Sequence, residues 1–446
     1  MKDKNFIKLE NIIIIFVFII ILAGIIFTRP IEDLDELWNF NFARNIANGL
    51  LPYKDFNMVQ MPLLPIVCGT ILKIFGTELF YMRCMAILLS CAILFTTYEI
   101  LKRIGVNKYI TRVSILSIIL LYMDHFCIDY NFMVALLILI TIYIEIKNID
   151  NKIEPKKEIA LGMFVGSSIL IKQTTGIVFS LVFVVYKLLI IYDRNKIKQE
   201  IKRLIFRLIG ILIPMFILIV YLVKNNIYNE CIDYTILGIK TFTNKISYIN
   251  LLKGTYGTNV QILSIVMPIL LVYMYIKTII LKVETKEDKI LFTLFSYSTA
   301  SLIVIYPISD SIHFLIGILP LEISLIYLVS QKLLKLDLNM EVKTILQGFT
   351  IIFLIMLLII LAFNIYNYYV EIKGKNYINN YKYILSDYEN INKIDEFILS
   401  NEKKGKSVYI LDAAAAMYMI PLNKYNKDYD MLMQGNFGSK RRRWHN

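Results

Sequence analysis

Charged residues are scarce in this 446-residue chain, at 19% of the total against the ~25% that is usual in globular proteins. Glycine and proline are also few, at 18 and 10 residues, which excludes a collagen-like or a Pro/Gly-rich disordered chain. There are five cysteines and no CxxC pair, so a disulfide scaffold and a zinc finger are excluded as well. The cysteines read as small packing residues: Cys68, Cys84, Cys91, Cys127 and Cys231.

Apolar residues, in contrast, are abundant: they make up 57% of the chain, and the mean hydropathy is +0.61. They fall in repeated runs of about 16–23 residues, and a helix needs ~20 residues to cross ~30 Å of hydrocarbon. This pattern excludes a soluble enzyme with one core and predicts an all-α polytopic membrane protein. We expect eleven spans, at 9–27, 80–101, 112–124, 131–146, 159–171, 177–192, 205–223, 261–281, 289–306, 312–330 and 347–369.

The charge distribution predicts the orientation of these spans. With the N-terminus in the cytoplasm, the inner segments hold 23 basic residues, and the outer loops before the tail hold nine. This asymmetry follows the positive-inside rule, and it accounts for the net charge of +13 without a nucleic-acid partner. The first run, 11–27, resembles a signal peptide, but no small-x-small cleavage site follows it, so we expect a retained helix.

The chain is expected to have two parts. Residues 1–369 form the transmembrane domain, with a long first outer loop at 28–79, and residues 370–446 form a small α/β tail outside the membrane. In the tail, 407–411 is strand-like and 412–419 is helix-like. The ending at 439–446 contains three consecutive arginines, which suggests a truncated or frameshifted tail; electrostatic binding to an anionic wall polymer is the alternative.

The first outer loop carries the strongest functional signal. Four carboxylates follow the first span directly, and apolar residues at near-helical spacing then suggest a short helix on the membrane, with Trp38 at the interface. A carboxylate at the bilayer edge loses hydration, which should raise its pKa toward the range of a general base. The alternative is that these carboxylates have only a structural role, in helix capping and solvation. The four acids are Glu32, Asp33, Asp35 and Glu36.

Three other positions combine polar residues with an outer membrane edge. Asp129 lies in an acid- and histidine-rich turn with Asp124 and His125, where substrate binding, a metal site and simple solvation all remain open. Lys172 and Gln173 interrupt an apolar run, as a tight turn or as a phosphate or sugar contact.

Asp310 and His313 are three residues apart and share one helix face, as an N-cap or as a substrate site. Arg83 would enter the membrane at the start of the second span. It needs either an acidic partner such as Glu78 or the phosphate of a lipid carrier.

These outer-loop features resemble those of the GT-C-fold glycosyltransferases. The shared features are an acidic pair after the first span, two surface helices in a long loop, and an arginine that opens the second span. More narrowly, residues 1–330 resemble bacterial proteins related to protein mannosyltransferases and aminoarabinose transferases. The resemblance implies that Asp35 is the catalytic base and that Glu36 supports it. The substrate-binding residues would be Arg83, Asp129, Lys172, Gln173, Asp310 and His313. Where aminoarabinose transferases often have Lys-Pro-Pro, this chain has Gln60, Met61 and Pro62, which puts a carrier-phosphate contact in that loop in doubt.

The expected function is therefore transfer of a sugar, with inversion, from a polyprenyl-phosphate carrier to an envelope glycan, lipid or protein outside the cell membrane. No cofactor is assigned. A divalent cation is compatible with the acids, but no residues are assigned as metal ligands. A transporter or lipid flippase is the first alternative, although it should carry paired intramembrane charges and internal repeats. A glycan polymerase that acts on lipid-linked sugars is the second.

Overall fold

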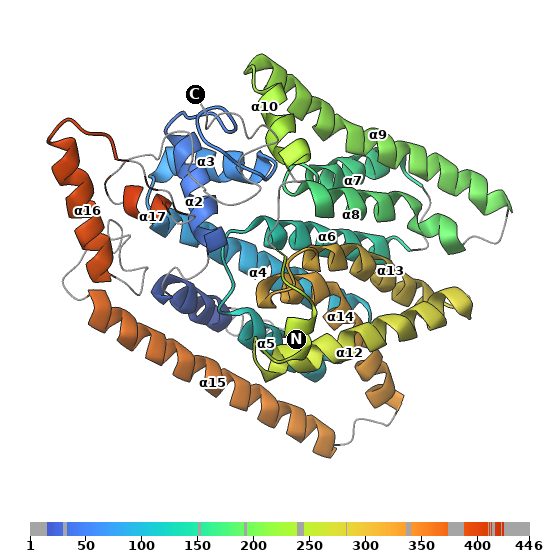
Figure 1. Ribbon diagram of the computed structural model, residues 1–446. Coiled ribbons are helices and arrows are strands. Elements are labelled where there is room, and N and C mark those ends of the chain that lie inside the picture. Colours follow the sequence, from blue (N-terminus) through green and yellow to red (C-terminus); the bar gives the residue numbers. More distant parts are fainter. Residues whose placement is uncertain are drawn as a thin grey trace, which may run out of the picture.

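The computed structural model describes residues 16–29, 34–149, 153–190, 194–238, 245–281, 283–335, 340–372 and 388–408, together with 410, 412, 415–420 and 422. These residues form a bundle of helices, in which α9 and α15 lie along opposite edges and α6, α13 and α14 lie between them (Figure 1). An N-terminal helix occupies Phe16–Thr28. The principal elements that follow are α2 (Leu34–Ala47), α3 (Leu63–Phe75), α4 (Leu79–Arg103), α5 (Lys108–Tyr122), α6 (Tyr130–Lys147), α7 (Pro155–Ser167), α8 (Gln173–Val185), η1 (Tyr186–Ile190), α9 (Arg194–Lys224), α10 (Tyr228–Ile232), η2 (Asp233–Leu237), α11 (Ile249–Leu252), α12 (Thr258–Tyr275), α13 (Lys286–Ser301), η5 (Leu302–Ile305), α14 (Ser311–Lys335), α15 (Met340–Ile372), α16 (Tyr388–Glu402) and α17 (Ala416–Met419).

Seven helices in the described residues are long and apolar enough to cross a membrane, and the chain is a multi-pass membrane protein. They are Leu79–Arg103, Tyr130–Lys147, Ile197–Lys224, Thr258–Ile280, Lys286–Ile305, Ser311–Leu333 and Val342–Val370. The other four predicted spans also fall on helices, but their described parts are shorter, at Phe16–Thr28, α5, α7 and Gln173–Leu189. The number of crossings therefore stays a prediction.

The two helices predicted in the first loop are present as α2 and α3. Eleven of the fourteen residues of α2 are buried, Trp38 among them, and its position relative to the membrane interface stays a prediction. Trp38 packs with Phe42, Tyr53 and Phe56 in a second apolar cluster that also includes residues of α9. The loop thus folds back onto the bundle, and α2 becomes part of its interior.

In the tail, the described residues form α16 and α17. The predicted helix at 412–419 corresponds to α17, whereas the strand predicted at 407–411 is not formed at the described positions 407, 408 and 410. Residues 439–446, on which the truncation hypothesis rests, lie outside the described residues. Contacts between α17 and α2 place this part of the tail beside the first loop.

Helices α7 and α9 cross closely, because glycines face each other at the contact. A Cβ on Gly162 or Gly210 would collide with the backbone of the opposite helix. Small residues of this kind let membrane helices approach and pack without a hydrophobic driving force.

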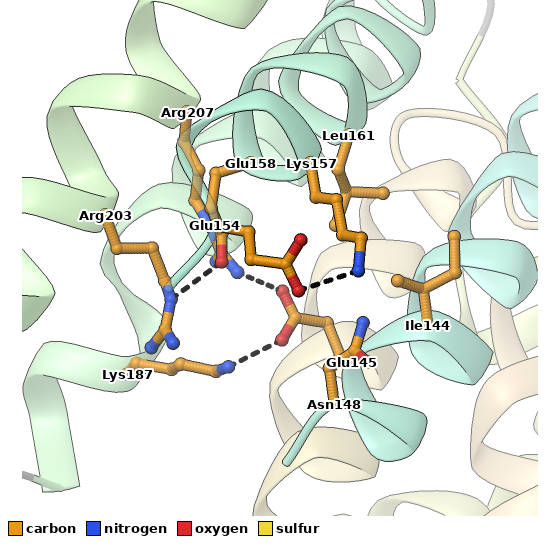
Figure 2. A pocket seen from close by; sticks show the side chains of 10 residues that line it. All are labelled: Ile144, Glu145, Asn148, Glu154, Lys157, Glu158, Leu161, Lys187, Arg203 and Arg207. Atoms are coloured by element: carbon orange, nitrogen blue, oxygen red, sulfur yellow. Dashed lines mark hydrogen bonds and ion pairs between the residues drawn. The ribbon is translucent and has the colours of Figure 1, made fainter. Parts of the chain in front are cut away.

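A network of buried charges lies beside this crossing, where α6, α7, η1 and α9 meet (Figure 2). Glu145 is 2% exposed and accepts hydrogen bonds from Lys187 Nζ and from the Tyr186 hydroxyl, both at 2.7 Å, and it also pairs with Arg207. Glu158 binds Arg207 Nε at 2.8 Å. We call this region the Glu145 end of the bundle.

Candidate active site

Asp35 and Glu36 lie in the first turn of α2, and the structure separates their surroundings. Consecutive helical residues point about 100° apart, since a turn contains ~3.6 residues. The Asp35 carboxylate lies 3.5 Å from the Tyr130 hydroxyl of α6, whereas the Glu36 carboxylate faces two arginines. The acidic pair is therefore a pair in sequence only.

Glu36 holds the first loop to the bundle. Its Oε1 accepts from Arg83 Nε at 3.1 Å, and its Oε2 lies 3.4 Å from Arg29 Nη2. Arg83 is fully buried and also donates to the carbonyl oxygens of Phe27 and Arg29. Arg29 in turn donates to the carbonyls of Asp124 and Phe126. The acid partner of Arg83 is thus Glu36 rather than Glu78, the acid suggested from the sequence, and these contacts give Arg83 a structural task.

Lys172 lies beside three of the predicted acids. Its ammonium donates to Asn131 Oδ1 and lies 5.0 Å from the centre of the Tyr130 ring. Burial lowers the pKa of Lys172 to about 8, while the carboxylates of Asp129, Asp35 and Asp310 act in the opposite direction. The tertiary structure therefore brings together residues from α2 and from the starts of α6, α8 and α14. We call this group the Lys172 cluster; it consists of Asp35, Asp129, Tyr130, Asn131, Lys172 and Asp310.

Asp129 caps the N-terminus of α6. It is fully buried and caps α6, because its Oδ1 accepts from the backbone N–H groups of Asn131 and Phe132 at 2.6 and 3.3 Å. An aspartate at this position satisfies amides that a helix start leaves unpaired. The cap fixes the start of α6 and so places Tyr130 and Asn131 next to Asp35 and Lys172.

Asp310 and His313 form the predicted i,i+3 pair. Asp310 Oδ1 lies 2.8 Å from His313 Nδ1 and accepts from the His313 backbone N–H at 2.9 Å. Burial raises the pKa of Asp310, but the hydrogen bonds and charge of His313 outweigh burial, and the net pKa is lowered. Asp310 therefore adds a negative charge to the Lys172 cluster at neutral pH.

Gln173 serves a different purpose from its neighbour Lys172. Its Nε2 donates to the carbonyls of Val59 and Thr235, both at 3.0 Å. These contacts tie the first loop to η2. In this conformation Gln173 holds two loops together, and a direct contact with a substrate stays a prediction.

Three participants were not selected from the sequence: Tyr130, Asn131 and Arg29. Tyr130 and Asn131 directly follow Asp129, so their position at the acidic turn was a usable signal. The role of Arg29 carried no such signal, since its partners Glu36 and Phe126 lie 7 and 97 residues away.

The site includes a carboxylate that can take part in proton transfer. Asp35 is 8% exposed and its carboxylate lies 3.5 Å from the Tyr130 hydroxyl, and a carboxylate is chemically able to accept a proton from an incoming hydroxyl. In the part of the chain that the structure describes, no three His, Cys, Asp or Glu side chains lie close enough to hold a metal ion.

Comparisons with family models and with the sequences of curated proteins found no match. Among solved structures, the chain is similar to the crystal structure of ArnT from Cupriavidus metallidurans bound to undecaprenyl phosphate. The two share 14% identity at a TM-score of 0.54, over 93% of this chain and 75% of ArnT. ArnT in the apo state gives a TM-score of 0.53 at 14% identity, over 95% of this chain and 75% of ArnT. ArnT is an aminoarabinose transferase with the GT-C fold, and this chain therefore has a GT-C-type fold.

Proposed function

We propose that this protein transfers a sugar from a polyprenyl-phosphate carrier to a hydroxyl of a cell-envelope acceptor, at the outer face of the cell membrane. The observation that carries the proposal is that Asp35 and Lys172 both approach Tyr130 in a GT-C-type bundle: the Asp35 carboxylate lies 3.5 Å from its hydroxyl, and Lys172 Nζ lies 5.0 Å from the centre of its ring. A carboxylate next to a buried cation offers a base and an anion-binding group within one site.

The reaction is a single displacement. The Asp35 carboxylate takes the proton of the acceptor hydroxyl, and the hydroxyl oxygen forms a bond to the anomeric carbon of the sugar. The bond from that carbon to the phosphate oxygen breaks on the opposite side, and the carrier leaves as a lipid phosphate. Attack opposite to the leaving group inverts the anomeric centre. The Lys172 ammonium stabilises the charge that develops on the phosphate.

The remaining predicted residues then divide into two groups. Asp129 and Asp310 act electrostatically on Lys172, and His313 is bonded to Asp310, so we assign these three to contacts with the substrates. Arg83 and Gln173 act indirectly, because their donors bind Glu36, Val59 and Thr235 and so keep the first loop in position.

The transfer reaction is tested directly with the purified, membrane-reconstituted protein. Undecaprenyl phosphate should bind it, and deletion of the protein should remove one glycan modification from the cell envelope, as read by mass spectrometry. The proposal would be contradicted if deletion left every glycan modification in place and the purified protein did not bind the carrier. Labelling of a single cysteine at position 34, where the native leucine is 40% exposed, from outside intact cells tests the orientation.

The pH dependence of carrier binding tests the role of Lys172. Only the ammonium form attracts phosphate, and the pKa of Lys172 is lowered to about 8. Affinity for undecaprenyl phosphate should therefore be constant at neutral pH and fall about tenfold per pH unit above pH 8. Thermophoresis of the detergent-solubilised protein measures the dissociation constant.

The control is Lys172→Arg, because a guanidinium stays charged above pH 12. In this variant the loss of affinity above pH 8 should disappear. If wild type and Lys172→Arg show the same pH profile, Lys172 is not the phosphate contact.

A further inference from the structure

Asn131 belongs to the Lys172 cluster and has a side-chain donor with no hydrogen-bond partner among the described residues. It is the second residue of α6, is 1% exposed, and lies between the Asp129 cap and the body of the helix. Its Oδ1 accepts from Lys172 Nζ, whereas its Nδ2 has no hydrogen-bond partner among the described residues.

An unpaired buried amide is costly, and such groups in native proteins usually have a reason. Oδ1 and Nδ2 belong to the same carboxamide, so the unused donor lies directly beside the Lys172 ammonium. The position therefore offers two adjacent donor groups, the Lys172 ammonium and Asn131 Nδ2. Among the described residues only the ammonium has an acceptor, which is Asn131 Oδ1.

The charges around the carboxamide indicate which kind of oxygen atom can accept a hydrogen bond from Nδ2. Lys172 lies in the field of three carboxylates, those of Asp129, Asp35 and Asp310. A phosphate is repelled by this surplus of negative charge unless it meets the ammonium itself. A sugar hydroxyl is neutral, and it can accept from Nδ2 while its own proton points to a carboxylate.

We propose that Asn131 binds a hydroxyl of the transferred sugar, next to the phosphate contact of Lys172, and so helps to determine which sugars are accepted. The proposal rests on the proposed function, because it assigns the sugar part of the same donor substrate. Lys172 Nζ is bonded to the carboxamide oxygen in this conformation, and the proposal requires the sugar hydroxyl to reach Nδ2 of the same group when Lys172 binds the donor phosphate.

The experiment compares bare undecaprenyl phosphate with four glycosylated forms that carry glucose, mannose, N-acetylglucosamine or arabinose. In the wild type, at least one glycosylated form should bind more tightly than the bare carrier. Asn131→Ala and the isosteric Asn131→Leu should each reduce this gain, the ratio of glycosylated-carrier to bare-carrier affinity, about three- to tenfold, as expected for one hydrogen bond. The ratio cancels any effect that loss of the contact with Lys172 has on both carriers. Two variants of different size keep the test valid if one of them does not fold.

Ser330→Ala is the matched control, since Ser330 Oγ is also buried without a partner but lies 19 residues, or about 28 Å, along α14 from Ser311. It should change neither affinity. The inference is overturned if no glycosylated form gains affinity in the wild type. It is also overturned if the variants keep the gain, or if they weaken bare and glycosylated carriers equally, which would make Asn131 part of the phosphate site or a support for Lys172. Absence of binding by every carrier in the wild type would instead overturn the proposed function.

Discussion

Replacement of Asp35 by asparagine is expected to lower sugar transfer by about 10²–10⁴-fold, the contribution of a general base. The amide keeps the shape of the carboxylate and its contact with the Tyr130 hydroxyl, but it cannot accept the proton of the acceptor. Carrier binding should change little, because Lys172 remains in place. The measurement is the initial rate of transfer from a radiolabelled glycosyl carrier, together with the dissociation constant of undecaprenyl phosphate.

Two substitutions separate this loss from damage to the loop. Asp55→Asn makes the same change in the same loop, where Asp55 Oδ2 accepts from the Leu51 backbone N–H at 2.7 Å, and it should leave transfer unchanged. Glu36→Gln leaves the buried Arg29 and Arg83 without a full counter-charge, so it should lower thermal stability together with activity. Full transfer by Asp35→Asn would exclude Asp35 as the base.

Replacement of Glu145 by glutamine is expected to destabilise the protein by about 3–5 kcal/mol, the cost of removing one member of a buried ion pair. The glutamine would leave Arg207 and Lys187 buried with too little negative charge, at the junction of α6, η1 and α9 (Figure 2). The temperature at which half of the solubilised protein remains monodisperse after heating should fall by several degrees.

Glu154→Gln is the control for Glu145→Gln, because Glu154 lines the same pocket but its pair with Lys157 is exposed on both sides. An exposed pair contributes ~0–1 kcal/mol, so this variant should melt close to wild type. Equal effects of the two substitutions would mean that the network at the Glu145 end does not stabilise the bundle.

Much of the architecture follows from local pattern. The apolar runs placed the long helices, and the near-helical spacing of apolar residues after the first span indicated the helix that is α2, at Leu34–Ala47. Helix ends were less certain, because polar and charged residues extend several helices beyond their apolar runs: the span predicted at 205–223 is part of α9, which begins at Arg194. The burial of α2 was not predictable in the same way, since part of its cover comes from α9 and α17, which are distant in sequence.

The sequence by itself determined that the chain is a helical membrane protein with acids, a lysine and a histidine at the ends of several helices, because hydropathy and spacing are local properties. The tertiary structure alone decided which of these residues meet. It brought Asp35, Asp129 and Asp310 close enough to act electrostatically on Lys172, and it placed Glu36 between Arg29 and Arg83. The physical reason is that charge pairing in a membrane bundle depends on which helix ends pack together, and two consecutive acids on one turn can face entirely different neighbours.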